Sequence, residues 1–592
     1  MQGVVGWVGG RGMSVAETAA AIRATLAAFP ALSMPGRSLQ GGAAILTALG
    51  QASSVAAEGD LLVACEGALT NRAALTSRLG PVPDESGDAG LILAAWRSWG
   101  QAVPGQLEGS FSFALRDAAA GTLFCARDPL GHIPFYYAQA GGAFAFSSSL
   151  PGLVTWRGLR RRANPDVLAH LLAFGYLPPD MTAFEGIATL EAGCCLELVP
   201  NAQPVLRRYW SLPEAAAEPR RRSPARTNGR PANTAAGKAL RSRLAEACAG
   251  DQVPDAMLLF GDHAGPLLAA AVDGASLLRP SYRVQGPEDG EAVAIRGGAV
   301  LVGPAALAAA PAWLWETGEP AADPLLPIRH AILSSPALAQ QTVGLDSGGD
   351  ELVLSRPDYA QFAGMLEQLR SNPGAFRGGG FHGGAVMARD LVQLAAGYFT
   401  EAERLNLSGP GLLHTLAFAV ADELGTGLET VPTEAAVDAA FRVDFARRLA
   451  AREAAAAWQA SRGRPAPVLV PFLRREVVEW CVSRSQAVRR QLAAPAPAGA
   501  KSVPIDAWLR GPLHGFARDT FASSAFRNRG LYNLAYVDQL VEQCFEHGEP
   551  TGRLIWPLLC LELWFKTFID RVPTKGLAPL TLERDASIIG VA

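Results

Sequence analysis

The stretch "LLFGDHAGPLLAAAV", residues 258–272, decides how the second half of this chain is interpreted. An apolar run leads into a short glycine-containing turn, and a helical run follows. A strand, a turn and a helix in this order form the outline of a phosphate-binding loop. Here, however, Phe260 offers no hydrogen-bond donor, and Pro266 removes a backbone N–H, although proline is tolerated in the first turn of a helix.

Two interpretations of this turn stay open. Asp262 brings a negative charge to the place where phosphates should lie, which is repulsive unless a metal ion intervenes. In a rebuilt site, Asp262 or His263 supplies a metal ligand and the helix N-terminus still attracts phosphate. In a decayed site, the turn keeps only its structural role.

The segments around this stretch predict an α/β domain. From about Thr234 onward, short apolar strands alternate with helical patterns, which indicates a parallel sheet. A glycine-rich stretch at 371–385 lacks the Lys-Ser/Thr ending of a phosphate loop, so we interpret it as a linker. The predicted strands contain "AMLLF" (256–260), "SYRVQG" (281–286) and "TVGLDSGG" (342–349), and the predicted helices "HTLAFAVADELG" (414–425) and "LIWPLLCLELWFKTFI" (554–569).

The first 210 residues have a different pattern, typical of an α+β domain with much antiparallel sheet. Apolar runs such as 60–69 and 121–128 are bounded by Gly and Asp, and helical patterns at 71–80 and 88–100 close with glycine. Residues 211–235 are rich in Pro, Arg, Ala and Ser without apolar periodicity, which predicts a linker. The predicted domains are therefore 1–210 and 236–592.

Composition restricts the class of protein. A chain of 592 residues exceeds one hydrophobic core, and a net charge of −3 argues against a general nucleic-acid or membrane-surface role. The eight cysteines form no C-x-x-C pair, so we expect no structural zinc and a reducing, cytoplasmic location. We find no signal-peptide pattern at the N-terminus and no apolar stretch long enough to span a membrane.

Several motifs, taken in order, resemble the asparagine synthetase family. In the first half these are "LEGSFSFALRD" (107–117), "ARDPLGHIPFYY" (126–137), "AFAFSSSL" (143–150), "LLAFGYLPPDMTAFEGIATLEAG" (171–193) and "RRYW" (207–210). In the second half they are the 258–272 stretch, "VGLDSGGDEL" (343–352), "PAPVLVPFLRREVVE" (465–479) and "AKSVPIDAWLRG" (500–511).

This resemblance covers most of the chain and implies both a fold and an activity. The implied fold is a four-layer αββα N-terminal-nucleophile domain joined to a doubly wound parallel-sheet domain that binds ATP. In that family, ATP activates a carboxylate as an acyl-adenylate, an amine attacks it, AMP leaves, and Mg²⁺ binds the pyrophosphate.

The glutaminase half departs from the family at its nucleophile. Glutamine-using members have a Cys after the initiator Met, and Gln2 stands there in this chain. The family's glutamine-holding "NGEIYN" becomes "EGALTN", with Glu66 for Asn and Ala68 for Glu. Asp88 matches a family Asp that grips the glutamine amine, or it is a helix N-cap. We therefore predict that glutamine hydrolysis is absent and that this domain is a scaffold.

The nucleotide site departs as well. The family loop reads S-G-G-x-D-S, and residues 260–266 stand in its place with one glycine, Gly261, in register. By resemblance, ATP and Mg²⁺ are the expected cofactors. The residues predicted to bind the nucleotide are Leu259, Gly261, Asp262, Val284, Gly348 and Asp350, with Asp350 and Asp262 as the candidate metal ligands.

Glu351 and Lys501 are the candidate catalytic residues. Within "DSGGDEL" (346–352), Asp350 and Glu351 match the family, although a glycine-rich turn closed by a capping Asp would give the same pattern. Lys501 matches a family Lys that stabilises charge on the adenylate and pyrophosphate, but an exposed Lys with no such role remains the alternative. Arg474 reverses the charge of the family's "PFLD", which predicts different substrate contacts there.

Three functions remain open at this stage. The first is an ATP-dependent, AMP-forming amide ligase similar to lasso-peptide cyclases and β-lactam synthetases, in which an amine already on the substrate attacks. Its substrate would be a peptide or small carboxylate, and a precursor-peptide protease would be a possible partner. The second is a catalytically degenerate scaffold for a peptide or partner, and the third is a glutamine-hydrolysing asparagine synthetase.

Overall fold

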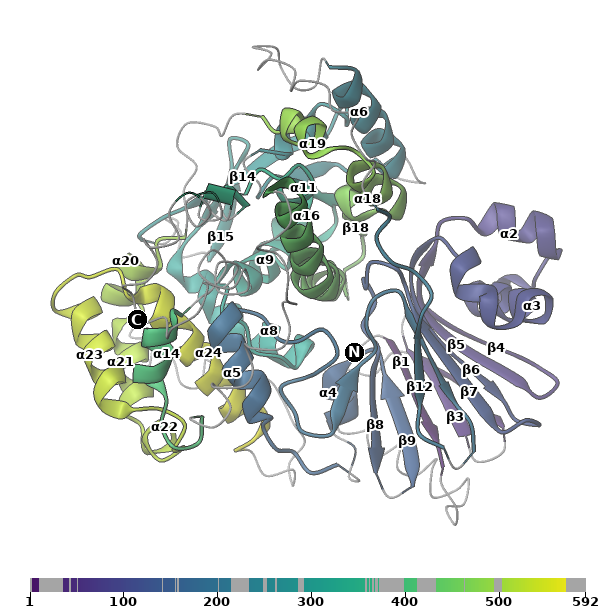
Figure 1. The fold of residues 1–592 in the computed structure, drawn as a ribbon, viewed down its shortest axis with the longest axis horizontal. Coiled ribbons are helices and arrows are strands. Elements are labelled where there is room, and N and C mark those ends of the chain that lie inside the picture. Colours follow the sequence, from purple (N-terminus) through teal and green to yellow (C-terminus); the bar gives the residue numbers. More distant parts are fainter. Residues whose placement is uncertain are drawn as a thin grey trace.

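The computed structural model places two antiparallel sheets and one mostly parallel sheet in a single chain (Figure 1). The structure describes residues 3–9, 36–41, 44–49, 52–140, 142–154, 156, 159–200, 202–214, 234–248, 253–260, 263–285, 292–356, 359–360, 363–364, 367, 371, 399–412, 433–462, 464–494 and 503–570.

The N-terminal domain packs its two antiparallel sheets face to face. The first sheet has the order β10 (Ile187–Thr189), β8 (Tyr136–Ala140), β9 (Ala143–Ser147), β1 (Gly3–Val8), β3 (Ala44–Leu49) and β2 (Gly36–Gly41). The second has the order β12 (Val205–Arg208), β11 (Cys194–Leu198), β7 (Thr122–Arg127), β6 (Gly109–Asp117), β5 (Leu61–Leu69) and β4 (Ser53–Glu58).

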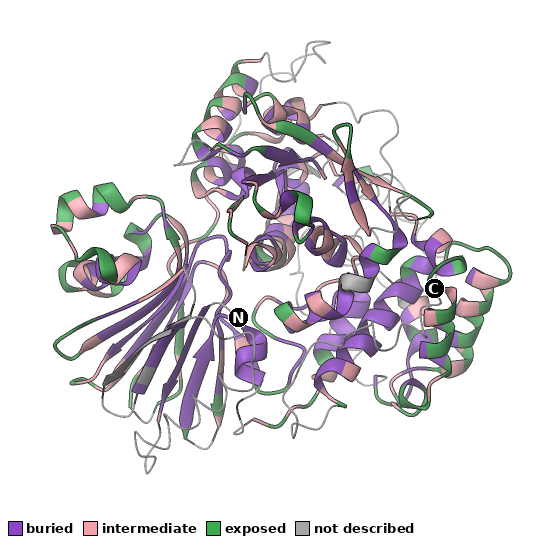
Figure 2. Ribbon diagram, turned by 180° about the vertical axis from the view of Figure 1, so that it is seen from behind, coloured by how far each residue is buried: buried purple, intermediate pink, exposed green. Residues whose placement is uncertain are grey.

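Strand β5 shows why these strands read as continuous apolar runs. Its alternate residues Leu62 and Ala64 point between the sheets, whereas Val63 and Cys65 point to the opposite face, where α3 packs. Both faces are buried, so hydrophobic side chains are needed at every position. Figure 2 shows this burial along the strands of both sheets.

Helices complete the four layers of this domain. Helices α2 (Arg72–Leu79) and α3 (Gly87–Trp99) lie outside the second sheet, with the short helices η2 (Asp84–Ser86) and η3 (Gly100–Gln106) beside them. Helices α4 (Leu150–Val154) and α5 (Pro165–Phe174) lie between the first sheet and the C-terminal domain, in the core cluster that both domains share. The predicted αββα arrangement is confirmed.

The C-terminal sheet is parallel except for one hairpin at its edge. Its order is β15 (Val293–Arg296), β16 (Ala299–Val302), β14 (Ser276–Tyr282), β13 (Ala256–Leu258), β17 (Val343–Leu345) and β18 (Val468–Leu469), with only β15 and β16 antiparallel. Strand β13 has β14 on one side and β17 on the other. The chain order therefore reverses at β13, which is the switch point of a doubly wound sheet. The predicted fold class is confirmed.

Helices and turns pack around this sheet. The helices after residue 503 also pack on one another at the C-terminal end of the chain. The α-helices are α6 (Ala235–Cys248), α7 (Gly265–Ala269), α8 (Ala310–Thr317), α9 (Leu325–Leu333), α10 (Pro336–Ala339), α11 (Gly349–Leu352), α14 (Glu401–Leu407), α16 (Thr433–Asp444), α17 (Ala454–Ser461), α18 (Arg475–Val482), α19 (Gln486–Leu492), α20 (Ile505–Arg510), α21 (His514–Ala522), α22 (Ser524–Arg527), α23 (Leu534–Phe545) and α24 (Gly552–Phe568). The remaining helices are the 3₁₀ turns η5 (Pro304–Ala309) and η7 (Pro471–Leu473) and the π-helix η6 (Phe445–Glu453).

One predicted strand was misplaced. The "SYRVQG" segment was expected to be a strand, but β14 begins earlier, at Ser276, and ends at Tyr282. It pairs with β13 over Ser276–Leu278 and with β16 over Arg279–Tyr282. Pro280 has no N–H to donate, and it lies in the part that has already left β13.

Other expectations fall partly or wholly outside the described residues. The predicted helix at 414–425 lies there, as do most of the glycine-rich stretch and most of the predicted linker. Residues 211–214 of that linker are described and form neither helix nor strand. Within the described part of the chain, no helix combines the length and apolar character needed to cross a bilayer.

Candidate functional site

The first candidate site lies where the neighbouring strands β13 and β17 end. Because both strands run in the same direction, the turns after Leu258 and Leu345 meet at one edge of the sheet. They are packed closely: a Cβ added at Gly349 would lie 2.6 Å from the Cβ of Ala264. This edge is where an open α/β sheet binds its ligands.

The backbone donors of the turn after β13 are paired with aspartates. The N–H groups of His263 and Ala264 donate to one oxygen, Oδ1 of Asp350, at 3.1 and 2.7 Å. The N–H of Phe260 donates to Oδ1 of Asp346 at 2.7 Å. Carboxylates from the β17 turn therefore receive hydrogen bonds from the N–H groups that would face an anion bound at this edge.

Three predicted nucleotide-binding residues follow adjacent strands. Leu259 follows β13 and is buried, with its N–H donating to the Leu278 carbonyl oxygen at 3.0 Å. Gly348 follows β17 with a φ of +85°, a left-handed conformation that favours glycine. Val284 follows β14 and is 54% exposed. The structure places all three at the ends of adjacent strands, and their role in binding remains a prediction.

The other predicted residues are divided between described and undescribed segments. Gly261, Asp262 and Lys501 lie outside the described residues. His263 Nδ1 contacts the Ala494 carbonyl oxygen at 2.8 Å, and the Ala494 N–H donates back to the His263 carbonyl oxygen at 2.9 Å. These two bonds join the turn after β13 to the segment that precedes Lys501.

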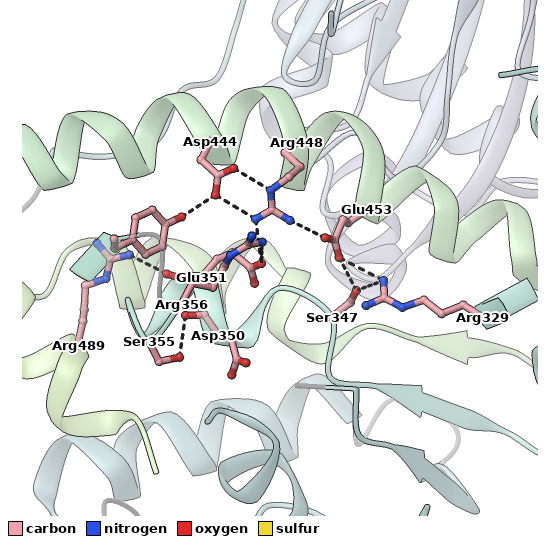
Figure 3. Close-up of polar contacts among 11 residues, drawn as sticks. Arg329, Ser347, Asp350, Glu351, Ser355, Arg356, Asp444, Arg448, Glu453 and Arg489 are labelled. Carbon is pink, nitrogen blue, oxygen red and sulfur yellow. Dashed lines mark hydrogen bonds and ion pairs between the residues drawn. The ribbon is translucent and has the colours of Figure 1, made fainter. Parts of the chain in front are cut away.

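Glu351 is paired with two arginines (Figure 3). Arg448 Nη2 donates to Glu351 Oε1 at 2.9 Å, and Arg356 Nη1 donates to the same oxygen at 3.1 Å. The Glu351 side chain is only 9% exposed. Its predicted catalytic role remains a prediction, and any substrate would meet a carboxylate that two guanidinium groups already hold.

Arg448 also binds two carboxylates on its own helix. It donates to Asp444 at 2.7 Å and to Glu453 Oε1 at 2.6 Å, and Tyr359 donates its hydroxyl to Asp444 at 2.6 Å. Burial alone would raise the pKa of the Asp444 carboxyl, but the charge of Arg448 outweighs it and holds that pKa below its ordinary value.

Glu453 connects this network to the β17 turn. Its Oε2 accepts hydrogen bonds from Ser347 Oγ at 3.0 Å and from Arg329 Nη1 at 3.2 Å. Burial would raise the pKa of the Glu453 carboxyl, yet Arg329 and Arg448 together lower it to about 2. No helix was predicted from the sequence at this place. The available signals were the Asp438–Arg442 and Asp444–Arg448 pairs, each four residues apart.

The second candidate site lies in the N-terminal domain, beside the first described residues of β1. A Cβ added at Gly3 would lie 2.9 Å from Glu66 Oε2 and 3.5 Å from Arg462 Nη2. Arg462 Nη2 donates to both Glu66 oxygens, at 2.9 and 3.0 Å, and Trp458 Nε1 donates to Glu66 Oε1 at 3.1 Å. Two side chains of the C-terminal domain therefore reach a carboxylate of the N-terminal domain.

Asp88 lies in the same domain and is also engaged. One of its oxygens accepts the Leu69 N–H at 3.0 Å, and the other pairs with Arg72. Burial raises the pKa of the Asp88 carboxyl above its ordinary value. The alternative that Asp88 is a helix N-cap is wrong, because α3 begins at Gly87 and its N-cap residue is Ser86.

Comparison with known proteins matches both halves. A model described as a glutamine amidotransferase domain matches residues 45–210, and one described as asparagine synthase matches residues 495–566. A Mycobacterium bovis protein named putative asparagine synthetase (glutamine-hydrolyzing) is 26% identical over 545 residues, which cover 84% of this chain and 82% of the relative. Over most of its length the chain is therefore similar to asparagine synthetases.

Further relatives show the same similarity. A Mycobacterium tuberculosis protein of the same name has the same identity and coverage, and asparagine synthetase 3 of Bacillus subtilis is 26% identical over 130 residues, or 22% of this chain and 21% of the relative. A solved glutamine phosphoribosylpyrophosphate amidotransferase from B. subtilis matches with 14% identity and a TM-score of 0.26, covering 46% of this chain and 63% of that one. A structural similarity this low adds nothing to the sequence comparisons.

The resemblance to asparagine synthetases implies a pyrophosphate and Mg²⁺ at the first site. Against the family loop S-G-G-x-D-S, Ala264 stands at the Asp position, and its N–H bonds Asp350. Among the described residues, no three His, Cys, Asp or Glu side chains form a group that could hold a metal ion. The described residues do not fit a bound pyrophosphate as arranged, because Asp346 and Asp350 already accept the turn's N–H groups and would repel it.

Glu66 in the second site departs from the motif that the resemblance to asparagine synthetases predicts. Glu66 stands at the Asn of the family's glutamine-holding motif, and it is 1% exposed beneath Arg462 and Trp458. A carboxylate that already accepts three hydrogen bonds is a poor ligand for an incoming glutamine. Gln2, at the position of the nucleophile, lies outside the described residues.

Proposed function

We propose that this member of the asparagine synthetase family is a scaffold that binds a peptide or a partner protein, and that it is not an autonomous ligase. One observation carries the proposal: Asp350 accepts hydrogen bonds from the N–H groups of His263 and Ala264. Those donors would bind pyrophosphate in a family member of standard sequence. An internal carboxylate in their place favours the decayed interpretation of the 258–272 stretch.

The N-terminal domain supports the same proposal. Glutamine hydrolysis needs a nucleophile next to a pocket that can receive the glutamine. Position 2 is a glutamine, and the motif that should hold the substrate has Glu66 paired with Arg462. Glutamine-dependent asparagine synthesis, the activity in the names of the relatives, is therefore the least favoured of the three candidate functions.

A second candidate is an amide ligase that uses an amine already present on its substrate, as lasso-peptide cyclases and β-lactam synthetases do. The placement of Leu259, Gly348 and Asp350 at the ends of adjacent strands favours it. Such a ligase would use ATP and Mg²⁺, act on a peptide or small carboxylate, and work beside a precursor-peptide protease. It would require Asp350 to leave the N–H groups that it now binds.

Titration calorimetry with millimolar ATP and Mg²⁺ separates the two candidates. For the scaffold we expect no ATP binding by the folded wild type. Replacing Asp350 by Ala then removes no binding. For the ligase, the wild type binds and Asp350→Ala abolishes the binding. The matched control is Asp273→Ala, because Asp273 is an exposed aspartate in the turn after α7.

A further inference from the structure

One continuous helical run reaches both candidate sites. Helix α16, the π-helix η6 and helix α17 follow each other without a break from Thr433 to Ser461. We call this run, together with Arg462 directly after it, the strap. Figure 3 shows its central part crossing above the β17 turn, with Asp444, Arg448 and Glu453 directed toward that turn.

The first set of strap contacts covers two residues of the first candidate site, which we call the synthetase-like site. These residues are Glu351 and Ser347. Arg448 pairs with Glu351 at 2.9 Å, and Glu453 accepts from Ser347 at 3.0 Å. The side chains of Arg448 and Glu453 are 17% and 18% exposed, so these pairs are screened little by solvent.

The second set lies further along the strap and crosses to the other domain. Trp458 and Arg462 both donate to Glu66, and Arg462 Nη2 also donates to the Ser148 carbonyl oxygen at 3.0 Å. The Arg462 side chain is 11% exposed and that of Glu66 is 1% exposed. Removing either partner would leave a buried charge unpaired, which is strongly unfavourable.

Both strap residues of the first set, Arg448 and Glu453, lie within the π-helix Phe445–Glu453, and the residues of the second set follow it along the strap. Arg448 and Glu453 are five residues apart and form a pair at 2.6 Å. In an α-helix of 3.6 residues per turn, two such residues point about 140° apart, whereas i→i+5 bonding brings them to the same side. The first set therefore depends on the π geometry, and a change to α geometry would rotate Trp458 and Arg462 away from Glu66.

We propose that the strap is an autoinhibitory element that closes both sites together and is held in register by Glu66 of the N-terminal domain. Displacing Arg462 from Glu66 then releases not only the second candidate site, which we call the glutaminase-like site, but also Glu351 and Ser347 in the other domain. This coupling holds whichever of the two candidate functions the protein has, because it concerns access to the sites and not their chemistry.

Hydrogen exchange followed by mass spectrometry on the full chain tests the coupling. In a Glu66→Gln variant, the amides of 343–354, which include the turn after β17, should exchange about fivefold faster or more than in the wild type. The matched control is Trp210→Phe, which removes another contact between the domains, the 2.8 Å bond to Glu479, without touching the strap. In that control, exchange at 343–354 should equal that of the wild type.

Two outcomes would overturn the proposal. In one, Glu66→Gln raises exchange only near 458–462 and leaves 343–354 protected. In the other, Trp210→Phe raises exchange at 343–354 as much as Glu66→Gln does, which would show general loosening of the interface. If Glu66→Gln does not fold, as judged by gel filtration and circular dichroism, Arg462→Lys keeps the charge, loses the paired contact and carries the same expectations.

Discussion

Side chains of the protein itself occupy both candidate sites, but they come from neighbouring turns in one site and from another domain in the other. In the synthetase-like site, carboxylates from the turn after β17 bind the N–H groups of the turn after the neighbouring strand, β13. In the glutaminase-like site, Glu66 is neutralised by Arg462, 396 residues away in the sequence and in the other domain. The first site is filled locally, whereas the second requires the two domains to be docked.

The acidic residues of the two sites therefore need different support from the rest of the molecule. An aspartate that accepts backbone N–H groups needs only the sheet edge that the fold already provides. A buried glutamate needs an opposite charge delivered to the same place, because an unpaired buried carboxylate costs several kcal/mol. The glutaminase-like site should therefore be the more sensitive of the two to mutation.

The largest effect is expected from Glu66→Ala. It leaves Arg462 buried without its counterion, which should lower the free energy of unfolding by about 3–5 kcal/mol. Thermal unfolding would report this as a loss of several degrees. The control is Glu58→Ala in the half-exposed pair with Arg97, expected to cost less than about 1 kcal/mol. Equal effects for the two variants would remove the contrast drawn between the sites.

Lowering the pH should also reduce the free energy of unfolding, through protonation of Glu453 near the first site. Glu453 has a folded pKa of about 2 against an ordinary 4.5, so its contribution is present above pH 4.5 and is lost as the pH falls toward 2. The difference corresponds to roughly 3 kcal/mol. Melting temperatures of wild type and Glu453→Gln should converge over this interval, whereas the exposed Glu476→Gln should follow the wild type throughout. A constant gap between wild type and Glu453→Gln would contradict the pairing.

A smaller effect is expected from Asp350→Asn. The amide oxygen can still accept the two N–H groups, but the charge that strengthens these bonds is lost, which should cost about 1 kcal/mol. Differential scanning calorimetry measures it, with the exposed Asp273→Asn as control. A loss of unfolding free energy several times larger would mean that the synthetase-like site is as sensitive to mutation as the Glu66–Arg462 pair between the domains.

The smallest effect is expected from Gln2→Cys. Restoring the nucleophile alone should leave glutamate release from glutamine at background, because Glu66 and Arg462 still fill the substrate position. A coupled glutamate dehydrogenase assay measures it, with Gln2→Ser as the control for the side chain. Turnover by Gln2→Cys alone would show that the Glu66–Arg462 pair does not block the pocket.

Much of the fold could be predicted from the sequence. Strands buried on both faces produce apolar runs such as β5, and alternating strands and helices indicate a parallel sheet. The strap could not be predicted, because its meaning depends on partners such as Glu351, 97 residues from Arg448. The charge pairs along this helix carry no sign in the sequence of their partners elsewhere, and in the structure their side chains are mostly covered.

Residue identity and local spacing were enough to predict the family resemblance, strands around 256–260 and 342–349, and the changed residues at positions 2 and 66 and in the 260–266 loop. The contacts that these residues make followed only from the tertiary structure. Whether Asp350 faces a metal ion or the N–H groups of a turn, and whether Glu66 is exposed or neutralised, depends on which distant groups share the same small volume. Coulomb and hydrogen-bond energies fall off within a few ångströms, so they are set by proximity in space and not by separation in sequence.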